Sequence, residues 1–87
     1  MERRISERKA IQCLIECKVG THEFVAHSFD ISPHGISFTS SRELPMDVEA
    51  TLRYRLDDEG PLITARVRLC QQSGGRIGAQ FIEQKHE

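Results

Sequence analysis

The sequence predicts an all-β fold, a small six-stranded antiparallel barrel. Apolar and polar residues alternate in several short runs, which is the period-2 pattern of strands with one buried face. Glycine, proline, aspartate and serine separate these runs, as expected of turns. No run has the period of an amphipathic helix or approaches the roughly 20 apolar residues of a membrane span. The 87 residues suit one domain, and closure of the sheet removes its exposed edges.

Three strands are expected in the first half of the chain, at residues 10–19, 23–29 and 36–39. The first has Ile15, Cys17 and Val19 on one face and mostly polar residues on the other. Between the second and the third lies a turn over residues 30–35, in which aspartate and serine can bond their own backbone. Gly35 ends this turn, because a glycine tolerates a positive φ there.

Three more strands are expected after a polar loop over 40–47, at residues 48–56, 62–72 and 76–82. Each of them alternates and so has one apolar face. The acidic segment 57–61 ends in Gly-Pro and joins the first two as a hairpin, and the Ser-Gly-Gly turn at 73–75 joins the last two. The hairpins fix which strands are neighbours, and closure into a barrel buries all the apolar faces together.

A basic leader precedes the first expected strand, although the formal net charge of the whole chain is −1. Its basic residues are Arg3, Arg4, Arg8 and Lys9, against the acidic Glu2 and Glu7. The near-neutral total disfavours bulk electrostatic binding to nucleic acid. We expect a flexible ligand-binding leader over 1–9, the barrel over 10–83 and a C-terminal tail over 84–87.

The cysteines and the N-terminus indicate a reducing compartment. No apolar stretch typical of a secretory signal follows Met1, so we expect a cytoplasmic protein. Three cysteines are an odd number, which favours free thiols. Cys13 and Cys17 lie about 13 Å apart along a strand, too far for one zinc ion with Zn–S bonds of about 2.3 Å. We therefore expect no metal site, and we expect both to pack as small apolar residues.

Two short motifs have the chemistry of a nucleotide site. The first motif consists of Arg3, Arg4 and Arg8 in the leader. Their guanidinium groups can donate paired hydrogen bonds to phosphate or to the O6/N7 edge of guanine. In the second, the Asp30 carboxylate can accept from guanine, the Ser32 hydroxyl can bond a phosphate or a base, and Gly35 allows close approach. Taken singly, the motifs are also typical of a solvated basic terminus and of an ordinary turn.

Together the two motifs resemble the PilZ family, whose members are bacterial receptors for cyclic di-GMP. The matching segments are Arg4-Ile5-Ser6-Glu7-Arg8, Asp30-Ile31-Ser32-Pro33-His34-Gly35 and, for the closing strand, Gly78-Ala79-Gln80-Phe81. The resemblance covers about residues 3–83. It implies a PilZ-like split barrel, but the helix that often follows the last strand in the family has no counterpart in this sequence.

The resemblance also implies a cyclic di-GMP site, made of Arg3, Arg4, Arg8, Asp30, Ser32 and Gly35. Arg4 and Arg8 would clamp phosphate and guanine, and Asp30 and Ser32 would bond guanine. In the family, an arginine at the position of Arg3 is associated with a stacked pair of ligand molecules. The implied protein is a receptor or adaptor without catalytic residues or cofactor. Its leader becomes ordered on ligand binding and signals to a protein partner, with no membrane involved.

Other functions stay open on the residues alone. One is a PilZ-like scaffold that binds protein but no nucleotide. Another is a single-strand nucleic-acid binder that uses a basic stripe formed by Arg53, Arg55, Arg66 and Arg68. Against the latter, the one tyrosine, Tyr54, is expected on the opposite face and gives no stacking platform. Asp30, Ser32 and His34 are the residue types of a hydrolase triad, but their alternation along the chain disfavours the mutual contacts that a triad needs.

Overall fold

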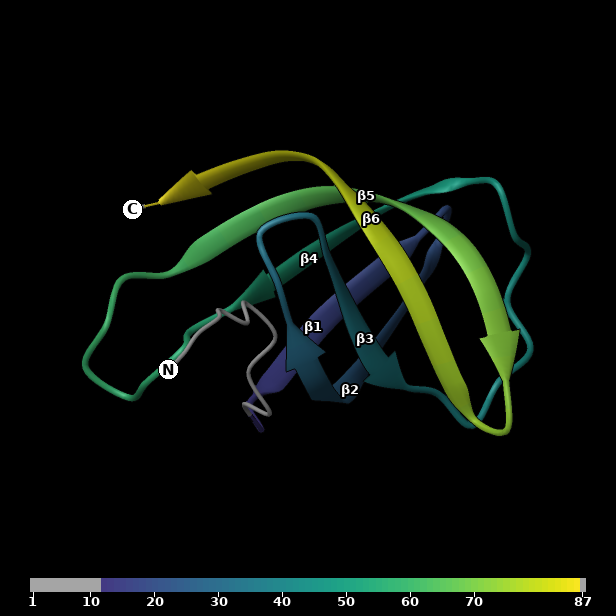
Figure 1. The fold of residues 1–87 in the computed structure, drawn as a ribbon, viewed down its shortest axis with the longest axis horizontal. Coiled ribbons are helices and arrows are strands. Elements are labelled where there is room, and N and C mark those ends of the chain that lie inside the picture. The colour runs from purple at the N-terminus through teal and green to yellow at the C-terminus, as the bar shows by residue number, and fades with distance from the viewer. Residues whose placement is uncertain (1–11, 87) are drawn as a thin grey trace, which may run out of the picture.

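A computed structural model describes residues 12–86, which form a closed barrel of antiparallel strands in the order β1-β2-β3-β6-β5-β4 (Figure 1). The strands are β1 (Leu14–Val19), β2 (His22–Ile31), β3 (Gly35–Thr39), β4 (Glu49–Tyr54), β5 (Ile63–Ser73) and β6 (Arg76–His86). The six-stranded antiparallel barrel predicted from the sequence is confirmed. This part of the chain includes no helix long and apolar enough to cross a membrane.

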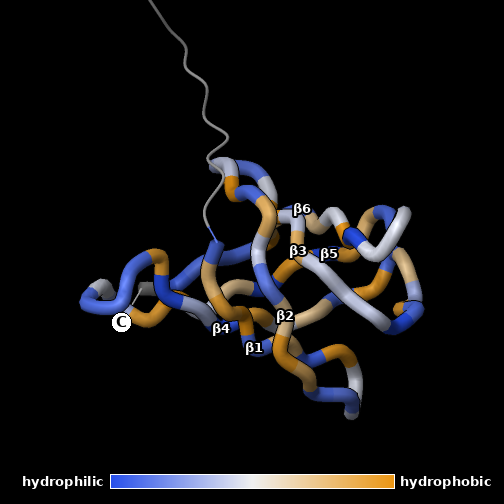
Figure 2. Tube along the Cα trace, turned by 90° about the horizontal axis from the view of Figure 1, so that it is seen from below, coloured by the Kyte–Doolittle hydropathy of each residue, from blue (hydrophilic) through white to orange (hydrophobic). Residues whose placement is uncertain are grey.

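The barrel interior is filled by every second residue of the strands. In β1, Ile15, Cys17 and Val19 are buried while their neighbours are exposed, as the alternation predicts. Figure 2 shows the same change between hydrophobic and hydrophilic residues along the strands. Phe38 and Leu52 are fully buried at the centre. Burial raises the pKa of the Cys17 thiol to about 11, so this cysteine is a neutral core residue, as expected.

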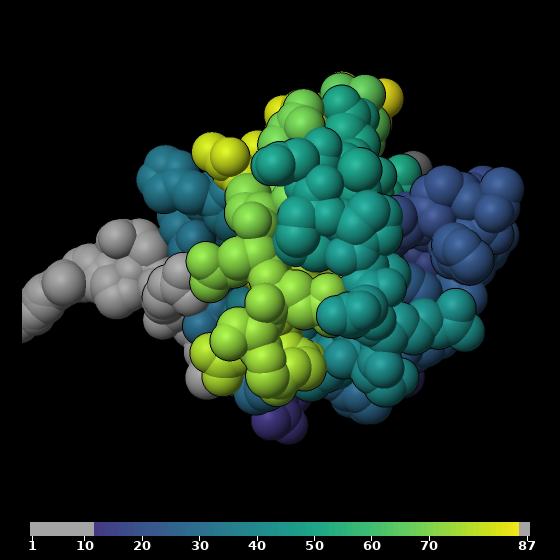
Figure 3. Space-filling view, turned by 90° about the vertical axis from the view of Figure 1, so that its right-hand side faces the viewer, coloured from purple at the N-terminus to yellow at the C-terminus, as the bar shows by residue number. Residues whose placement is uncertain are grey.

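The loop before β4 is held against the far end of the β5–β6 hairpin. The Gln72 side chain accepts a hydrogen bond from the Leu44 amide (3.0 Å) and donates one to the Arg42 carbonyl (2.7 Å). The Ser40 amide donates to the Gly75 carbonyl at 2.9 Å. Figure 3 shows the two segments side by side. These bonds keep the β5–β6 turn in place although it extends beyond the barrel wall.

Two strands are longer than the alternation indicates. β2 was expected to end at residue 29 but continues to Ile31, so Asp30 lies in a strand and not in a turn. A bulge between Ser28 and Asp30 shifts the register, and β2 then pairs with β3 again. β6, expected to end at residue 82, continues to His86 because it stays paired with β5 as far as Ile63.

Candidate ligand-binding site

A surface cavity of about 440 Å³ lies on the outside of the barrel, over β3, β6 and the end of β5. Its lining includes Ser32, His34, Gly35, Ser37, Arg76 and Gly78. The volume falls within the roughly 300–1,000 Å³ of small-molecule sites. The cavity is open to solvent, so a ligand would lie on the barrel wall and keep one side accessible.

A row of neighbouring residues crosses four strands here, and three of them, Ser37, Gly78 and Gln71, line the cavity. Asp30 in β2 pairs with Ser37 in β3, Ser37 pairs with Gly78 in β6, and Gly78 pairs with Gln71 in β5. The Ser37 hydroxyl donates a 2.7 Å hydrogen bond to Asp30 Oδ1, which holds the carboxylate beside the cavity. Because Gly78 has no side chain, the row is hollow between Ser37 and Gln71.

The β2–β3 turn forms one wall and is built around the Ser32 hydroxyl. Ser32 Oγ accepts hydrogen bonds from the amides of His34 (3.3 Å) and Gly35 (3.2 Å), while the Ser32 amide donates to the Gly35 carbonyl at 2.9 Å. The side-chain oxygen thus satisfies backbone donors that would otherwise be unpaired in the turn. The turn is therefore held in one shape, with Ser32 and the exposed His34 at the cavity.

Gly35 is required for a different reason from the one expected. Its φ is not positive; the glycines with positive φ are Gly20, Gly74 and Gly75. Gly35 is the first residue of β3, where a Cβ atom would collide with the carbonyl oxygen of Ala79 in β6. The expectation of a left-handed turn residue is wrong, because the constraint is the close approach of β6, which lies far along the chain.

The structure brings together the predicted residues of the turn motif but leaves the leader untested. Ser32 and Gly35 line the cavity, and Asp30 lies beside it through its bond to Ser37. Arg3, Arg4 and Arg8 lie outside the described residues.

Sequence reasoning did not predict several residues at or near the cavity, among them Ser37, Gly78, Arg76 and Phe29. The Arg76 guanidinium lies 4.0 Å from the centroid of the Phe29 ring, a cation–π contact, and Arg76 also lines the cavity. Arg76 lies between the turn glycines and the buried Ile77, so the alternation of the strand predicts that its side chain faces outward. Phe29 gives no such signal, because it lies at the β2 bulge.

The residues of the suspected hydrolase triad make other contacts. The Asp30 carboxylate accepts from Ser37, and Ser32 Oγ bonds the turn backbone. Over residues 12–86, no hydrogen bond joins the side chains of Asp30, Ser32 and His34.

The same part of the chain has no group of three or more His, Cys, Asp or Glu residues placed to hold a metal ion.

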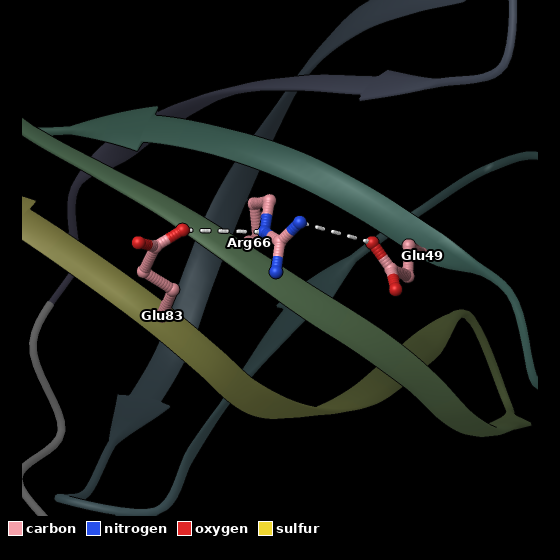
Figure 4. Close-up of polar contacts among 3 residues, drawn as sticks. All are labelled: Glu49, Arg66 and Glu83. Atoms are coloured by element: carbon pink, nitrogen blue, oxygen red, sulfur yellow. Dashed lines mark ion pairs between the residues drawn. The ribbon is translucent and has the colours of Figure 1, made fainter.

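The basic stripe lies on the outside of β4 and β5, and its charges are interleaved with acids. Arg66 contacts Glu49 at 3.7 Å and Glu83 at 3.4 Å (Figure 4), and Arg53 contacts Glu16 at 3.5 Å. The other two arginines bond backbone: Arg55 donates to the Gly60 carbonyl and Arg68 to that of Asp47. Tyr54 is 3% exposed and faces the core, as predicted. Within residues 12–86, two of the four arginines are thus paired with acids, and Tyr54 gives this surface no aromatic platform of the kind that a single-strand binder uses.

The fold is a small β-barrel with a cavity, the candidate ligand site, on its outer wall. The chain matches the family model of the PilZ domain over residues 2–87 and belongs to the PilZ domain family. PilZ domains are generally cyclic di-GMP receptors, and they are generally binding or adaptor domains rather than enzymes. No curated protein matches the chain.

Proposed function

We propose that this protein is a bacterial, cytoplasmic cyclic di-GMP receptor that binds its ligand on the outer wall of the barrel. The main support is the row Asp30–Ser37–Gly78, in which a held carboxylate lies beside a hollow made by a glycine. Guanine is planar and carries adjacent N–H donors on one edge. Such a ring fits a shallow hollow with a carboxylate acceptor at its rim.

In this proposal Asp30 reads the guanine edge. A carboxylate has about four lone-pair sites, so Asp30 can accept from guanine and keep the hydrogen bond from Ser37. Ser37 then acts as a positioning residue, because its hydroxyl fixes the carboxylate. The Ser32 hydroxyl lies on the cavity wall and offers a further polar contact, while the Ser32-centred turn keeps both groups in register.

The leader would add to the charge of Arg76 the further positive charge that suits a doubly anionic ligand. Arg4 and Arg8 would bind phosphate and guanine, and Arg3 would hold a second, stacked ligand molecule. Closure of the leader over the ligand would create a new surface for a protein partner. For this switch to work, the ligand must bind the closed arrangement more tightly than the open one.

A calorimetric titration of the full chain with cyclic di-GMP tests the proposal. We expect saturable binding with two ligand molecules per chain, and we expect Arg3→Ala to reduce the stoichiometry to one. Asp30→Ala should weaken binding while the barrel stays folded by circular dichroism. Absence of binding by the wild-type protein would favour the alternative function, a PilZ-like scaffold that binds a protein partner but no nucleotide.

A further inference from the structure

The C-terminal part of β6 has an edge that none of the described strands covers. β3 pairs with β6 only from Arg76 to Gln80, and the last hydrogen bond between these segments runs from the Phe81 amide to the His34 carbonyl (2.9 Å). β5 stays paired with β6 as far as His86. From Ile82 to His86, β6 therefore has β5 on one edge, and on its other edge no strand of residues 12–86 (Figure 1).

An open strand edge presents unpaired backbone N–H and C=O groups and is a template for another strand. The edge here spans five residues, 82–86, of which Ile82 is 42% exposed. Ile82 lies at a register shift, since Arg66 pairs with Glu83 and Val67 with Phe81. After this shift the pairing with β5 is regular, so alternate backbone groups of this stretch point away from β5.

We propose that this edge pairs with the same edge of a second copy of the chain, antiparallel and about a two-fold axis. A two-fold interface uses the same surface on both copies, so the segment must be complementary to itself. In such a pairing, one residue of the segment faces its own equivalent across the axis.

Of the three registers that place residue 83, 84 or 85 on the two-fold axis, only one brings opposite charges together. With Gln84 on the axis, Glu83 of each copy lies opposite Lys85 of the other, which makes two pairs of opposite charge. With Glu83 or Lys85 on the axis, two like charges face each other directly. The order Glu-Gln-Lys therefore favours the register centred on Gln84.

Existing ion pairs extend this complementarity. Glu83 lies 3.4 Å from Arg66, which in turn lies 3.7 Å from Glu49 (Figure 4). Lys85 of the second copy would continue this row of alternating charges across the new strand pair. Glu83 and Lys85 are both exposed, so neither has to be released from the core. Exposed ion pairs contribute mainly to the choice of register, while backbone hydrogen bonds supply the pairing itself.

Sedimentation velocity of the full chain without nucleotide tests the proposal. The wild-type protein should dimerise reversibly, with a dissociation constant below about 1 mM. Glu83→Lys and Lys85→Glu each place like charges opposite each other on both sides of the two-fold axis. Each variant should raise the dimer dissociation constant about tenfold. An equimolar mixture of the two variants should form a heterodimer with restored affinity, because every facing pair is then of opposite charge.

Lys18→Glu is the matched control. It makes the same charge change at an exposed residue of β1, away from the edge, and should leave the dimer unchanged. Circular dichroism checks that Glu83→Lys, which also loses the Arg66 contact, remains folded. A wild-type protein that stays monomeric over the whole range would overturn the proposal, as would a dimer that the charge variants and their mixture do not affect. Because nucleotide is absent, neither result depends on cyclic di-GMP binding.

Discussion

The outer wall of the barrel has two faces built on opposite principles. Over β3 and the part of β6 that pairs with it, the outward positions include the small residues Gly35, Ser37 and Gly78, beside Thr39, Arg76 and Gln80. Over β4 and β5, several outward positions hold long charged side chains, and Arg66 among them pairs with Glu49 and with Glu83 of β6. The first face leaves space beside a fixed carboxylate, whereas the second is covered by long side chains, of which Arg53 and Arg66 are paired with acids. A ligand site on this barrel is therefore expected on the face with the small residues.

The largest effect should come from a single methyl group where β3 meets β6. Gly35→Ala places a Cβ atom against the backbone carbonyl of Ala79, and backbone cannot move aside as a flexible side chain can. We expect the free energy of unfolding to fall by about 3 kcal/mol, measured by urea denaturation. Gly78→Ala is the control, since its Cβ atom would meet only the Gln71 side chain, at 3.4 Å. Equal stability of the two variants would contradict this account.

The next effect concerns charge, and it compares the leader with the basic stripe. Arg8→Ala should weaken cyclic di-GMP binding about 10- to 100-fold, because it removes hydrogen bonds between charged groups. Arg53→Ala removes the same side chain from the β4–β5 face, where Arg53 contacts Glu16, and should leave the affinity unchanged. Calorimetric titration of each variant with cyclic di-GMP measures the two affinities. A comparable loss for both would indicate general electrostatic attraction and not a defined site.

A smaller effect is expected from filling the cavity floor. Gly78→Ala adds a methyl group between Ser37 and Gln71, at the hollow where a guanine ring would lie. The affinity for cyclic di-GMP should fall about tenfold, while stability changes by less than about 1 kcal/mol. Calorimetry and urea denaturation of the same sample separate the two quantities. Unchanged affinity would mean that the ligand does not contact this part of the wall.

The contrast between the faces was only partly predictable from the sequence. Alternation identifies the strands and their buried sides, as in β1, because each residue's face depends on its immediate neighbours. A bulge breaks that rule, since it adds one residue to one strand and leaves the composition unchanged. The extension of β2 to Ile31, the contact between Phe29 and Arg76, and the shift at Ile82 all depend on bulges, and none was predicted.

Long-range contacts explain the rest of the difference. The hairpin turns predict which consecutive strands are neighbours, but the pairing of β3 with β6 closes the wall between segments far apart in the chain. Gly35 was recognised as a special position, yet the atom that constrains it belongs to Ala79. The Asp30–Ser37 bond depends on the same register. Local patterns thus indicated some of the candidate site residues, and the contacts of these residues depend on the tertiary register.

The smallest effect should come from the charged face, where removing a charge tests whether that face is only solvated surface. Arg66→Gln keeps much of the side chain but ends the contacts with Glu49 and Glu83, each about half exposed. Exposed ion pairs contribute about 0.2–1 kcal/mol, so the free energy of unfolding should fall by at most about 1 kcal/mol. In about 1 M salt, where the Debye length is about 3 Å, the difference from wild type should nearly vanish. A loss above about 2 kcal/mol that persists in salt would show that the β4–β5 face contributes to the stability of the fold and is more than solvated surface.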